Sequence, residues 1–468
     1  MINFEAHDKG FFQVSYVRSS GLDTPQEELF ENAIAIDEFV NYCEIHSSLD
    51  MAFRVGILSL YDSISFREKL GFIGNDIITI NYTTQDLSEN TDLEERKQVS
   101  FRIINIEEVV DSTTDVKLTS GKRRTLNLTL AEFPLYDYYV VNQIYRTYDW
   151  GSGDETTKPQ GTQTISDIVT DLLSEEVSPN LLNGWGYETD IQDTNDLSDP
   201  DKKWNFYVPR WSLLKTVNYL KRFAISNEGN YPNYIFTSRD ILDRKIISFK
   251  SVYSIINDDQ AKRNIIEYTP RSVIQDIIGK DPNKANPAWL VNTVLSWSYS
   301  FYNGFDISFG GLSGKTYLTH DLYDGLKAQA YSFEQYKSDY KIGLDSYYIY
   351  KDSFGDQWSN IYYNAFENKN DNLMINAYAK KALGSVRCQA KCYLNPFRYI
   401  GQHARLNFNS VDPINGGQID AINNGDWITW GITDVFTTGG SCFSVVDFRK
   451  DSVFLNSTVS NGLETAGG

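Results

Sequence analysis

Two stretches of this chain alternate apolar and polar residues with a period of two, and this pattern constrains the fold more than any other feature. Residues 124–130 alternate arginine and leucines with threonine and asparagine, and residues 385–394 place valine, cysteine, alanine and leucine at every second position. Successive side chains of a strand point to opposite faces, so each stretch predicts a strand with one buried face. Further β-rich runs at similar spacing predict an antiparallel barrel or sandwich.

The composition agrees with a sheet-rich globular protein. Aromatic residues make up 14% of the 468 residues, and large flat side chains suit the pleated faces of sheets. Hydrophobic residues at 41% and charged residues at 22% are near the values of ordinary soluble chains, which excludes disorder and collagen-like or coiled-coil folds for the whole chain. The length predicts about three domains.

The sequence pattern changes from β-rich to mixed α/β and back to β-rich along the chain. We expect a first β block over residues 1–147, a small α/β middle block over 148–265, a second β block over 266–455 and a C-terminal tail over 456–468. A polar, aromatic insertion near 351–382 interrupts the second β block. The fold class is therefore mainly β with an α/β insertion.

Individual elements follow from local patterns. In the middle block, apolar residues at helical spacing predict helices near 165–173 and 211–225, followed by a hairpin whose turn is Ser238–Arg244. We expect a short crossing helix over 62–70 and a solvated acidic loop over 85–98. Strands are predicted over 53–60, 76–82, 100–110, 123–130, 297–302, 385–394, 426–435 and 441–449.

The net charge of −19 limits the partners. A surface this acidic repels phosphate, which disfavours ordinary nucleic-acid binding and adhesion to anionic membranes. No apolar run approaches the roughly 18–20 residues of a membrane span, and the start of the chain lacks the features of a signal peptide. Four cysteines are too few for a disulfide framework. We expect assembly in a reducing cytoplasm.

One glycine-rich segment imitates a phosphate-binding loop. Gly310–Thr316 ends in Gly-Lys-Thr, but Phe309 occupies the position where the first glycine of that loop belongs. Strand-like residues follow instead of a helix whose N-terminus could hold phosphate. We therefore predict a glycine turn between strands.

Cys388, Cys392 and His403 could suggest zinc. Both cysteines occupy apolar positions of the alternating stretch, and four residues along a strand span about 13 Å, too far to share a metal or form a disulfide. We predict buried core thiols. Cys43 and Cys442 have no partner pattern either.

Other candidate sites are weak. Asp193–Asp201 resembles a calcium loop, but leucine and serine stand where a ligand and the turn glycine belong. None of the four histidines lies in a triad or zinc motif. The pairs Glu107–Glu108 and Glu175–Glu176 are typical of exposed faces. We predict no catalytic residue, no cofactor and no metal.

An ordered set of segments resembles one family, the central hub proteins of contractile phage baseplates, which are also similar to the base of type VI secretion spikes. The most specific segment is Val208–Ala224 with the hairpin that follows it, and the resemblance covers residues near 50 to 455. The insertion near 351–382 matches nothing in the family. The other segments are 99–108, 125–130, 164–173, 313–321, 426–435 and 446–452.

The resemblance implies two tube-like antiparallel barrels flanking the α/β block, and a non-enzymatic virion protein of the tail baseplate. It implies a homotrimer that joins the hexameric tail tube protein or tube initiator to a trimeric central spike protein, beside neighbouring baseplate proteins. DNA would pass through its lumen without specific binding, and no membrane would be bound. No lysozyme module follows residue 455, so we expect no fused hub–lysozyme.

The alternative is a carbohydrate-active tail protein, either a glycan-binding module or a glycanase. Exposed aromatic rings that stack on sugars, with carboxylates, would serve it. Trp150, Trp185 and Trp358 are the residues whose exposure would favour this alternative.

Overall fold

The computed structural model describes the parts of the chain that carry regular structure, and every statement below concerns those residues. They are 10–18, 33–62, 69, 71–72, 76–84, 97–111, 123–149, 164–176, 185–194, 205–227, 231–241, 244–257, 265–280, 292–300, 315–321, 325–331, 357–363, 376, 380, 386–408, 425–437 and 441–450.

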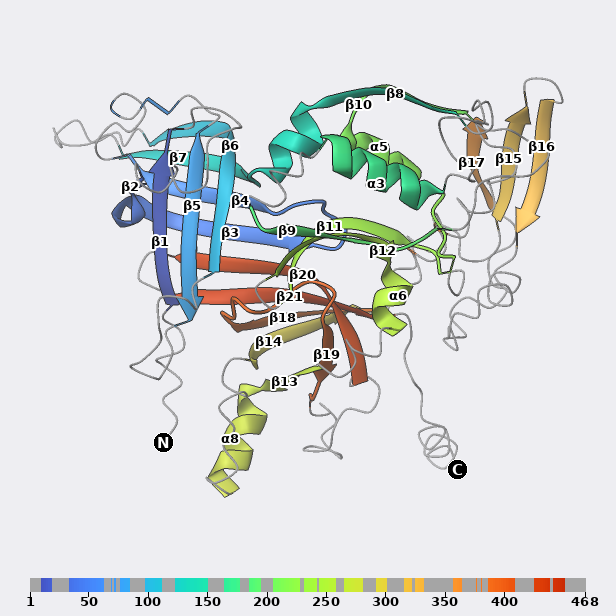
Figure 1. The fold of residues 1–468 in the computed structure, drawn as a ribbon. Helices are drawn as coiled ribbons and strands as arrows, with labels where there is room; N and C mark the ends of the chain where they lie inside the picture. The colour runs from blue at the N-terminus through green and yellow to red at the C-terminus, as the bar shows by residue number, and fades with distance from the viewer. Residues whose placement is uncertain are drawn as a thin grey trace, which may run out of the picture.

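One thirteen-stranded sheet runs through both β blocks (Figure 1). Its strand order is β19-β13-β14-β18-β21-β20-β3-β4-β7-β6-β5-β1-β2, so the protein is mainly β as predicted. The strands are β1 Gly10–Val17, β2 Ile34–Ala35, β3 Val40–Ser48, β4 Val55–Tyr61, β5 Ile77–Thr84, β6 Lys97–Asp111, β7 Arg123–Glu132, β13 Ile266–Pro270, β14 Thr293–Ser300, β18 Val386–Tyr393, β19 His403–Leu406, β20 Gly425–Thr437 and β21 Cys442–Lys450.

The seam between the two β blocks is a strand pair. β3 of the first block and β20 of the second pair antiparallel from Tyr42 opposite Thr437 to Ser48 opposite Gly431. Backbone hydrogen bonds between strands far apart in sequence therefore join the blocks directly.

The strands of the second β block form a closed circuit. β20, β21, β18, β14, β13 and β19 pair in turn, and β19 pairs back onto β20. The inward positions of β18 are Val386, Cys388, Ala390 and Cys392, all buried in one core with Phe448. Because these strands close into a circuit, the inward-facing apolar side chains of β18 are shielded from solvent.

The first β block curls around a core to which the second β block also contributes Leu394, Phe436 and Cys442. Val14 of β1 and Cys43 of β3, near opposite ends of its run of strands, are buried in the same cluster as Leu58, Phe101 and Leu128. Shared burial of strands from both ends shows that this part of the sheet wraps around one apolar interior.

The middle block combines a ribbon, two helices and a small sheet. The ribbon is β8 (Gln143–Asp149), which begins before the predicted boundary at 147/148, paired with β10 (Asn205–Ser212). A π-helical turn η4 (Asp137–Val141) precedes β8. In Figure 1 the helices α3 (Ile165–Glu176) and α5 (Leu213–Leu220) lie between this ribbon and the sheet β11-β12-β9. That sheet consists of β9 Tyr187–Ile191, β11 Tyr234–Ile241 and β12 Arg244–Ser251.

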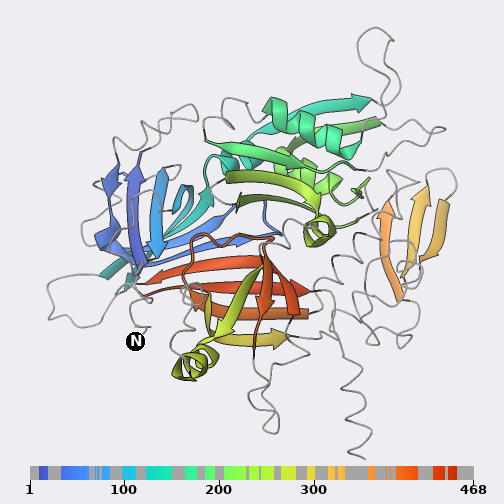
Figure 2. The ribbon, with the colours of Figure 1, turned by 60° about the horizontal axis from the view of Figure 1, so that its bottom comes forward.

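The remaining elements complete the description. Short helices α6 (Val252–Asn257) and α8 (Arg271–Lys280) follow β12 and β13, and the view in Figure 2 shows them at the second β block. A separate sheet has the order β16-β15-β17, with β15 Lys315–Asp321, β16 Gly325–Tyr331 and β17 Gln357–Tyr363. No described helix is long and apolar enough to cross a membrane.

Most predicted strands are confirmed, with three corrections. The helix predicted over 211–225 is shorter, because Trp211 belongs to β10 and Ser212 caps the helix by accepting from the Lys215 amide. The hairpin turn is tighter than Ser238–Arg244, since β11 continues to Ile241. Lys97 and Gln98 belong to β6 and not to a loop. The helix predicted over 62–70 and the tail over 456–468 lie outside the described residues, apart from isolated positions.

Candidate functional site: the buried junction of the three blocks

The most concentrated set of buried charges lies where the three blocks meet. Arg54 precedes β4, Glu132 ends β7, Lys97 begins β6, and Asp240 comes from β11 of the middle block. Arg54 and Glu132 are at most 5% exposed. Ionised side chains are rarely buried this deeply unless they are paired, so the partners of each group decide what the site can do.

Arg54 is the centre of this cluster. Its guanidinium forms an ion pair with Asp240, and its backbone N–H donates to Glu132 Oε2 over 2.8 Å. The Tyr187 hydroxyl donates to the other Glu132 oxygen over 2.9 Å. Lys97 Nζ lies 3.4 Å from Asp240 Oδ2 and donates to the Pro396 carbonyl over 3.0 Å. One arginine thus joins the first β block to the middle block, and one lysine joins both to the second.

The charge states follow from this pairing. Burial alone would raise the pKa of Asp240, but Arg54 and Lys97 outweigh it and hold that pKa well below its ordinary range. Burial lowers the pKa of Lys97, opposed by Asp240. Burial, reinforced by Glu132, raises the pKa of Tyr187 well above its ordinary value. At neutral pH Asp240 is therefore ionised and the Tyr187 phenol is neutral.

The turn between β3 and β4 belongs to all three cores. Leu49 is buried with the second β block, Ala52 with the middle block, and Cys43 and Leu58 on the flanking strands with the first. Backbone bonds hold the turn on both sides: the Leu49 amide donates to the Trp430 carbonyl, and the Ala52 carbonyl accepts from the Ser238 amide, each over 2.9 Å. The β3–β4 turn and its flanking strands therefore contribute residues to all three cores.

A side chain from the predicted insertion also reaches the junction. Asn376 is buried, its amide nitrogen donates to the carbonyls of Arg222 and Ala224 over 2.9 and 3.1 Å, and its oxygen accepts from the Asn233 amide. These bonds satisfy backbone groups just beyond α5, where the helix has ended. Four residues on, Lys380 pairs with Asp50 of the β3–β4 turn at 3.6 Å.

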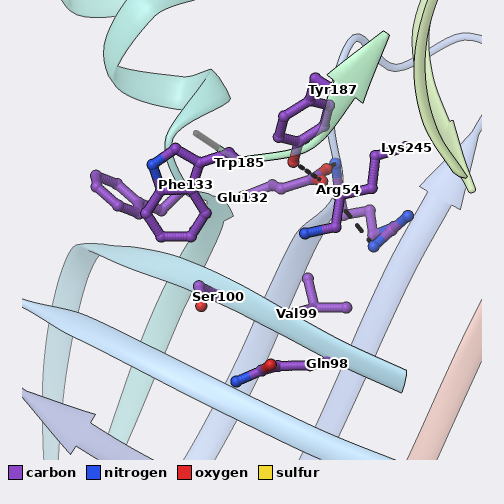
Figure 3. A pocket seen from close by; sticks show the side chains of 9 residues that line it. All are labelled: Arg54, Gln98, Val99, Ser100, Glu132, Phe133, Trp185, Tyr187 and Lys245. Atoms are coloured by element: carbon purple, nitrogen blue, oxygen red, sulfur yellow. Dashed lines mark hydrogen bonds and ion pairs between the residues drawn. The ribbon is translucent and has the colours of Figure 1, made fainter. Parts of the chain in front are cut away.

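The junction leaves almost no empty space. A cavity of about 10 Å³ lies between Arg54, Glu132, Trp185, Tyr187 and Lys245 (Figure 3). That is about enough for a single water molecule and far below the volume of a substrate. Figure 3 shows Tyr187 and Arg54 directed at Glu132. The contacts at this junction are ion pairs and hydrogen bonds between the blocks.

A second polar cluster lies at the seam of β3 and β20. His46 Nδ1 is 2.9 Å from Thr433 Oγ1, and His46 Nε2 is 3.0 Å from Glu44 Oε1. The Tyr42 hydroxyl donates to the other carboxylate oxygen, Glu44 Oε2. Burial alone would raise the pKa of Glu44, but hydrogen bonds from Tyr42 and His46 lower it. The order hydroxyl, imidazole, carboxylate is that of a hydrolytic triad. Here the His46–Thr433 contact links β3 to β20, so the cluster connects the two blocks across the seam.

The motifs weighed in the sequence fall in different places. Cys388 and Cys392 are buried in the barrel core and all four cysteines are free, as predicted. His403 is buried on β19, with Nε2 3.0 Å from the Ile255 carbonyl. Among the described residues, no three potential ligands gather as a metal site. The end of Gly310–Thr316 opens strand β15, so a strand follows the glycines as predicted.

Other predicted features are only partly described. Asp193 and Thr194 are placed, but the rest of Asp193–Asp201 lies outside the described residues. Glu107 is exposed, and Glu108 pairs with Arg124 at 3.5 Å. The side chains of Glu175 and Glu176 are not described.

Trp185 does not fit the glycan-binding alternative. Its side chain is 7% exposed, and its ring meets Phe133 edge to face with centroids 5.1 Å apart. A ring enclosed in this way has no face free for a sugar. Trp150 and the side chain of Trp358 lie outside the described residues.

Sequence reasoning missed the junction for identifiable reasons. Asp240 was assigned to a hairpin turn, where a carboxylate is ordinarily solvated, whereas β11 extends past it. Lys97 was assigned to an acidic loop. Glu132 and Arg54 did carry a signal, because each is a charge at the end of an apolar β-run. Only the packing of three blocks shows that these charges meet.

No family model matches this chain, and no curated protein matches it. Structure comparison does find solved structures, and the three described here share 8–10% identity with this chain. A tail protein from Neisseria meningitidis MC58 is 8% identical, with 94% of this chain and 97% of that chain covered and a TM-score of 0.49. The 43 kDa tail protein of prophage MuSo2 from Shewanella oneidensis is 10% identical, with 94% and 98% covered and a TM-score of 0.46.

A third similar structure is a secretion-system protein. An E. coli component of the type VI secretion system, described as similar to T4 bacteriophage tail proteins, is 8% identical, with 90% and 76% covered and a TM-score of 0.41. The predicted resemblance is confirmed. The solved structures to which this chain is similar are phage tail proteins and a component of a type VI secretion system.

Proposed function

We propose that this protein is the central hub of a contractile-tail baseplate, a structural virion protein assembled in the host cytoplasm. Three copies form a ring that joins the hexameric tail tube protein or its initiator to a trimeric spike protein, next to other baseplate proteins. The first β block (1–147) and second β block (266–455) supply two tube-like domains per chain, and the middle block (148–265) braces them.

The observation that carries this proposal is the unbroken run of strands β14-β18-β21-β20-β3-β4-β7-β6. Both ends of this run have unpaired edges among the described residues. β5 covers β6 only as far as Arg102, and β13 covers β14 only at Thr293 and Val294. Beyond these points Ile104, Val109 and Trp297 are 42%, 44% and 37% exposed.

Unpaired edges with apolar side chains are sites for pairing with another chain. The two edges belong to different strands, so a contact between them is head to tail, and such contacts form a ring when the rotation from copy to copy closes. Three copies would place six β blocks around a central opening. A net charge of −19 suits a lumen through which DNA passes without being held, since an acidic wall avoids counterion release.

The test is the mass of the full chain in solution, alone and with its spike protein. We expect a homotrimer of the 53.5 kDa chain. Replacing Ile104 and Val109 with Lys should leave a folded chain that no longer trimerises, because charged side chains block edge pairing. The matched control is Ile57→Lys, an exposed apolar position on the interior strand β4. A chain that stays monomeric with its spike present contradicts the hub.

A further inference from the structure

One surface of the middle block places cations beside aromatic rings. The Arg210 guanidinium carbon lies 5.9 Å from the ring centre of Tyr145, and Lys215 Nζ lies 4.7 Å from that of Trp211. Tyr145 is 65% exposed, the highest value among the exposed large apolar side chains of the described residues. We call Tyr145, Arg210, Trp211 and Lys215 the cationic strip.

The backbone at Arg210 is strained. Its φ of +50° falls in the left-handed region that residues with a side chain rarely adopt, and the β8–β10 register shifts between Pro209 and Trp211. Bulges redirect side chains, and strain that packing does not explain is associated with function. Arg210 is exposed, so burial of its side chain does not explain the strain.

Among the described residues, the cations of the strip have no carboxylate partner. Arg54, Arg102, Arg239 and Arg244 each pair with a carboxylate. Within the described part of the chain, neither Arg210 nor Lys215 does. The strip thus presents two uncompensated positive charges on a chain with a net charge of −19.

The ribbon that carries the strip can accept another strand. β8 and β10 pair with each other and with no other described strand. A two-stranded ribbon leaves backbone donors and acceptors along its outer edges, which extended segments of partner proteins use in β-augmentation.

We propose that the cationic strip binds a short, extended acidic segment of another protein. The segment adds to the β8–β10 ribbon, its carboxylates face Arg210 and Lys215, and its apolar residues cover Tyr145. Charges on the rest of the chain are screened beyond about 8–10 Å at physiological salt, so a short segment responds mainly to the local cations. A long nucleic acid would extend past the strip onto an acidic surface, which disfavours it.

The first experiment measures binding of a labelled (Glu-Val)4 peptide to the full chain by fluorescence anisotropy, with (Lys-Val)4 as the opposite-charge probe. We expect the acidic peptide to bind saturably and the (Lys-Val)4 peptide not to bind. Added salt should weaken the binding of the acidic peptide. Arg210→Glu with Lys215→Glu should weaken it at least tenfold. The control, Lys69→Glu with Arg405→Glu, makes the same charge change elsewhere and should leave binding within twofold.

Two results would overturn the proposal. One is equal weakening by the strip and control variants, which would make the effect one of net charge. The other is binding of a (dT)10 oligonucleotide as tight as that of the peptide, which would show a general polyanion surface. The proposal does not depend on the ring, because the assay needs only a folded chain.

Arg210→Gly separates binding from folding. Glycine adopts positive φ without strain, so the melting temperature should stay the same or rise. The loss of one cation should still weaken peptide binding several-fold. If Arg210→Gly binds the peptide as tightly as the wild-type chain, the strained arginine has no part in recognition and the proposal fails.

Discussion

The interior of the second β block and the junction of the three blocks are both buried, yet they are built from opposite kinds of residue. The barrel interior contains apolar side chains and free thiols such as Cys388 and Cys392. The junction contains Arg54, Glu132 and Asp240. Apolar contacts are non-directional, whereas ion pairs require particular partners at particular distances. The difference indicates that strand pairing fixes the barrel and the seam between the two β blocks, while charge pairing fixes how the middle block sits against them.

The largest expected effect comes from placing a charge where only apolar packing exists. Leu220→Asp at the end of α5 would put a carboxylate into the core of the middle block, where Leu220 is 1% exposed. We expect a loss of several kcal/mol, because an unpaired buried charge is strongly destabilising. Solubility and trimer content should collapse, while Asn218→Asp, half-buried on the same helix, should remain soluble.

The next effect tests the charges of the junction. Arg54→Met keeps much of the side-chain volume but removes the cation beside Glu132 and leaves Asp240 with Lys97 as its remaining ion-pair partner among the described residues. We expect a loss of about 3–5 kcal/mol in urea unfolding, as for other broken buried pairs. Arg244→Met is the control, since its pair with Glu188 is exposed and such pairs contribute little. Equal losses in the two variants would show that burial does not matter.

The same pair predicts an acid dependence. The pKa of Asp240 is below its ordinary value in the folded chain. Its contribution to stability is therefore complete above about pH 4 and is lost as the pH falls through the folded pKa. The difference between wild type and Arg54→Met should narrow below about pH 4.

A third variant tests the partly buried ammonium of Lys221, whose charged neighbours include both Lys380 and Asp50. Burial, with repulsion from Lys380, lowers the pKa of Lys221 to about 8, opposed by Asp50. The unfolded lysine keeps its proton to about pH 10.4, so stability should rise with pH between these values. Lys221→Met should stabilise the chain at pH 7 by up to about 3 kcal/mol, at roughly 1.4 kcal/mol per pKa unit. The gain should vanish near pH 10.5; a gain that persists there would assign it to packing.

The sequence was sufficient wherever a local period determines the structure. The alternation from Val386 to Cys392 predicted both the strand and the buried thiols, and the apolar spacing of Leu213, Val217 and Leu220 predicted a helix. It was insufficient at the junction, because the identity of a buried charge says nothing of which distant residue will neutralise it. The closure of β19 onto β20 and the β3–β20 seam are likewise non-local pairings.

The smallest effect belongs to the barrel interior. Cys388→Ala removes one sulfur from a closely packed core and should cost on the order of 1–2 kcal/mol, the cost of a small cavity. Substitution of the exposed neighbour, Gln389→Ala, should cost much less stability.

The thiols of Cys388 and Cys392 should also be unreactive in the folded chain. Burial raises the pKa of both thiols, that of Cys392 to about 11, so thiol reagents at pH 8 should modify neither until the chain unfolds. A non-reducing gel should show no internal bridge and elemental analysis no stoichiometric zinc. Unfolding by a chelator would contradict this, and would mean that the barrel also depends on specific pairing.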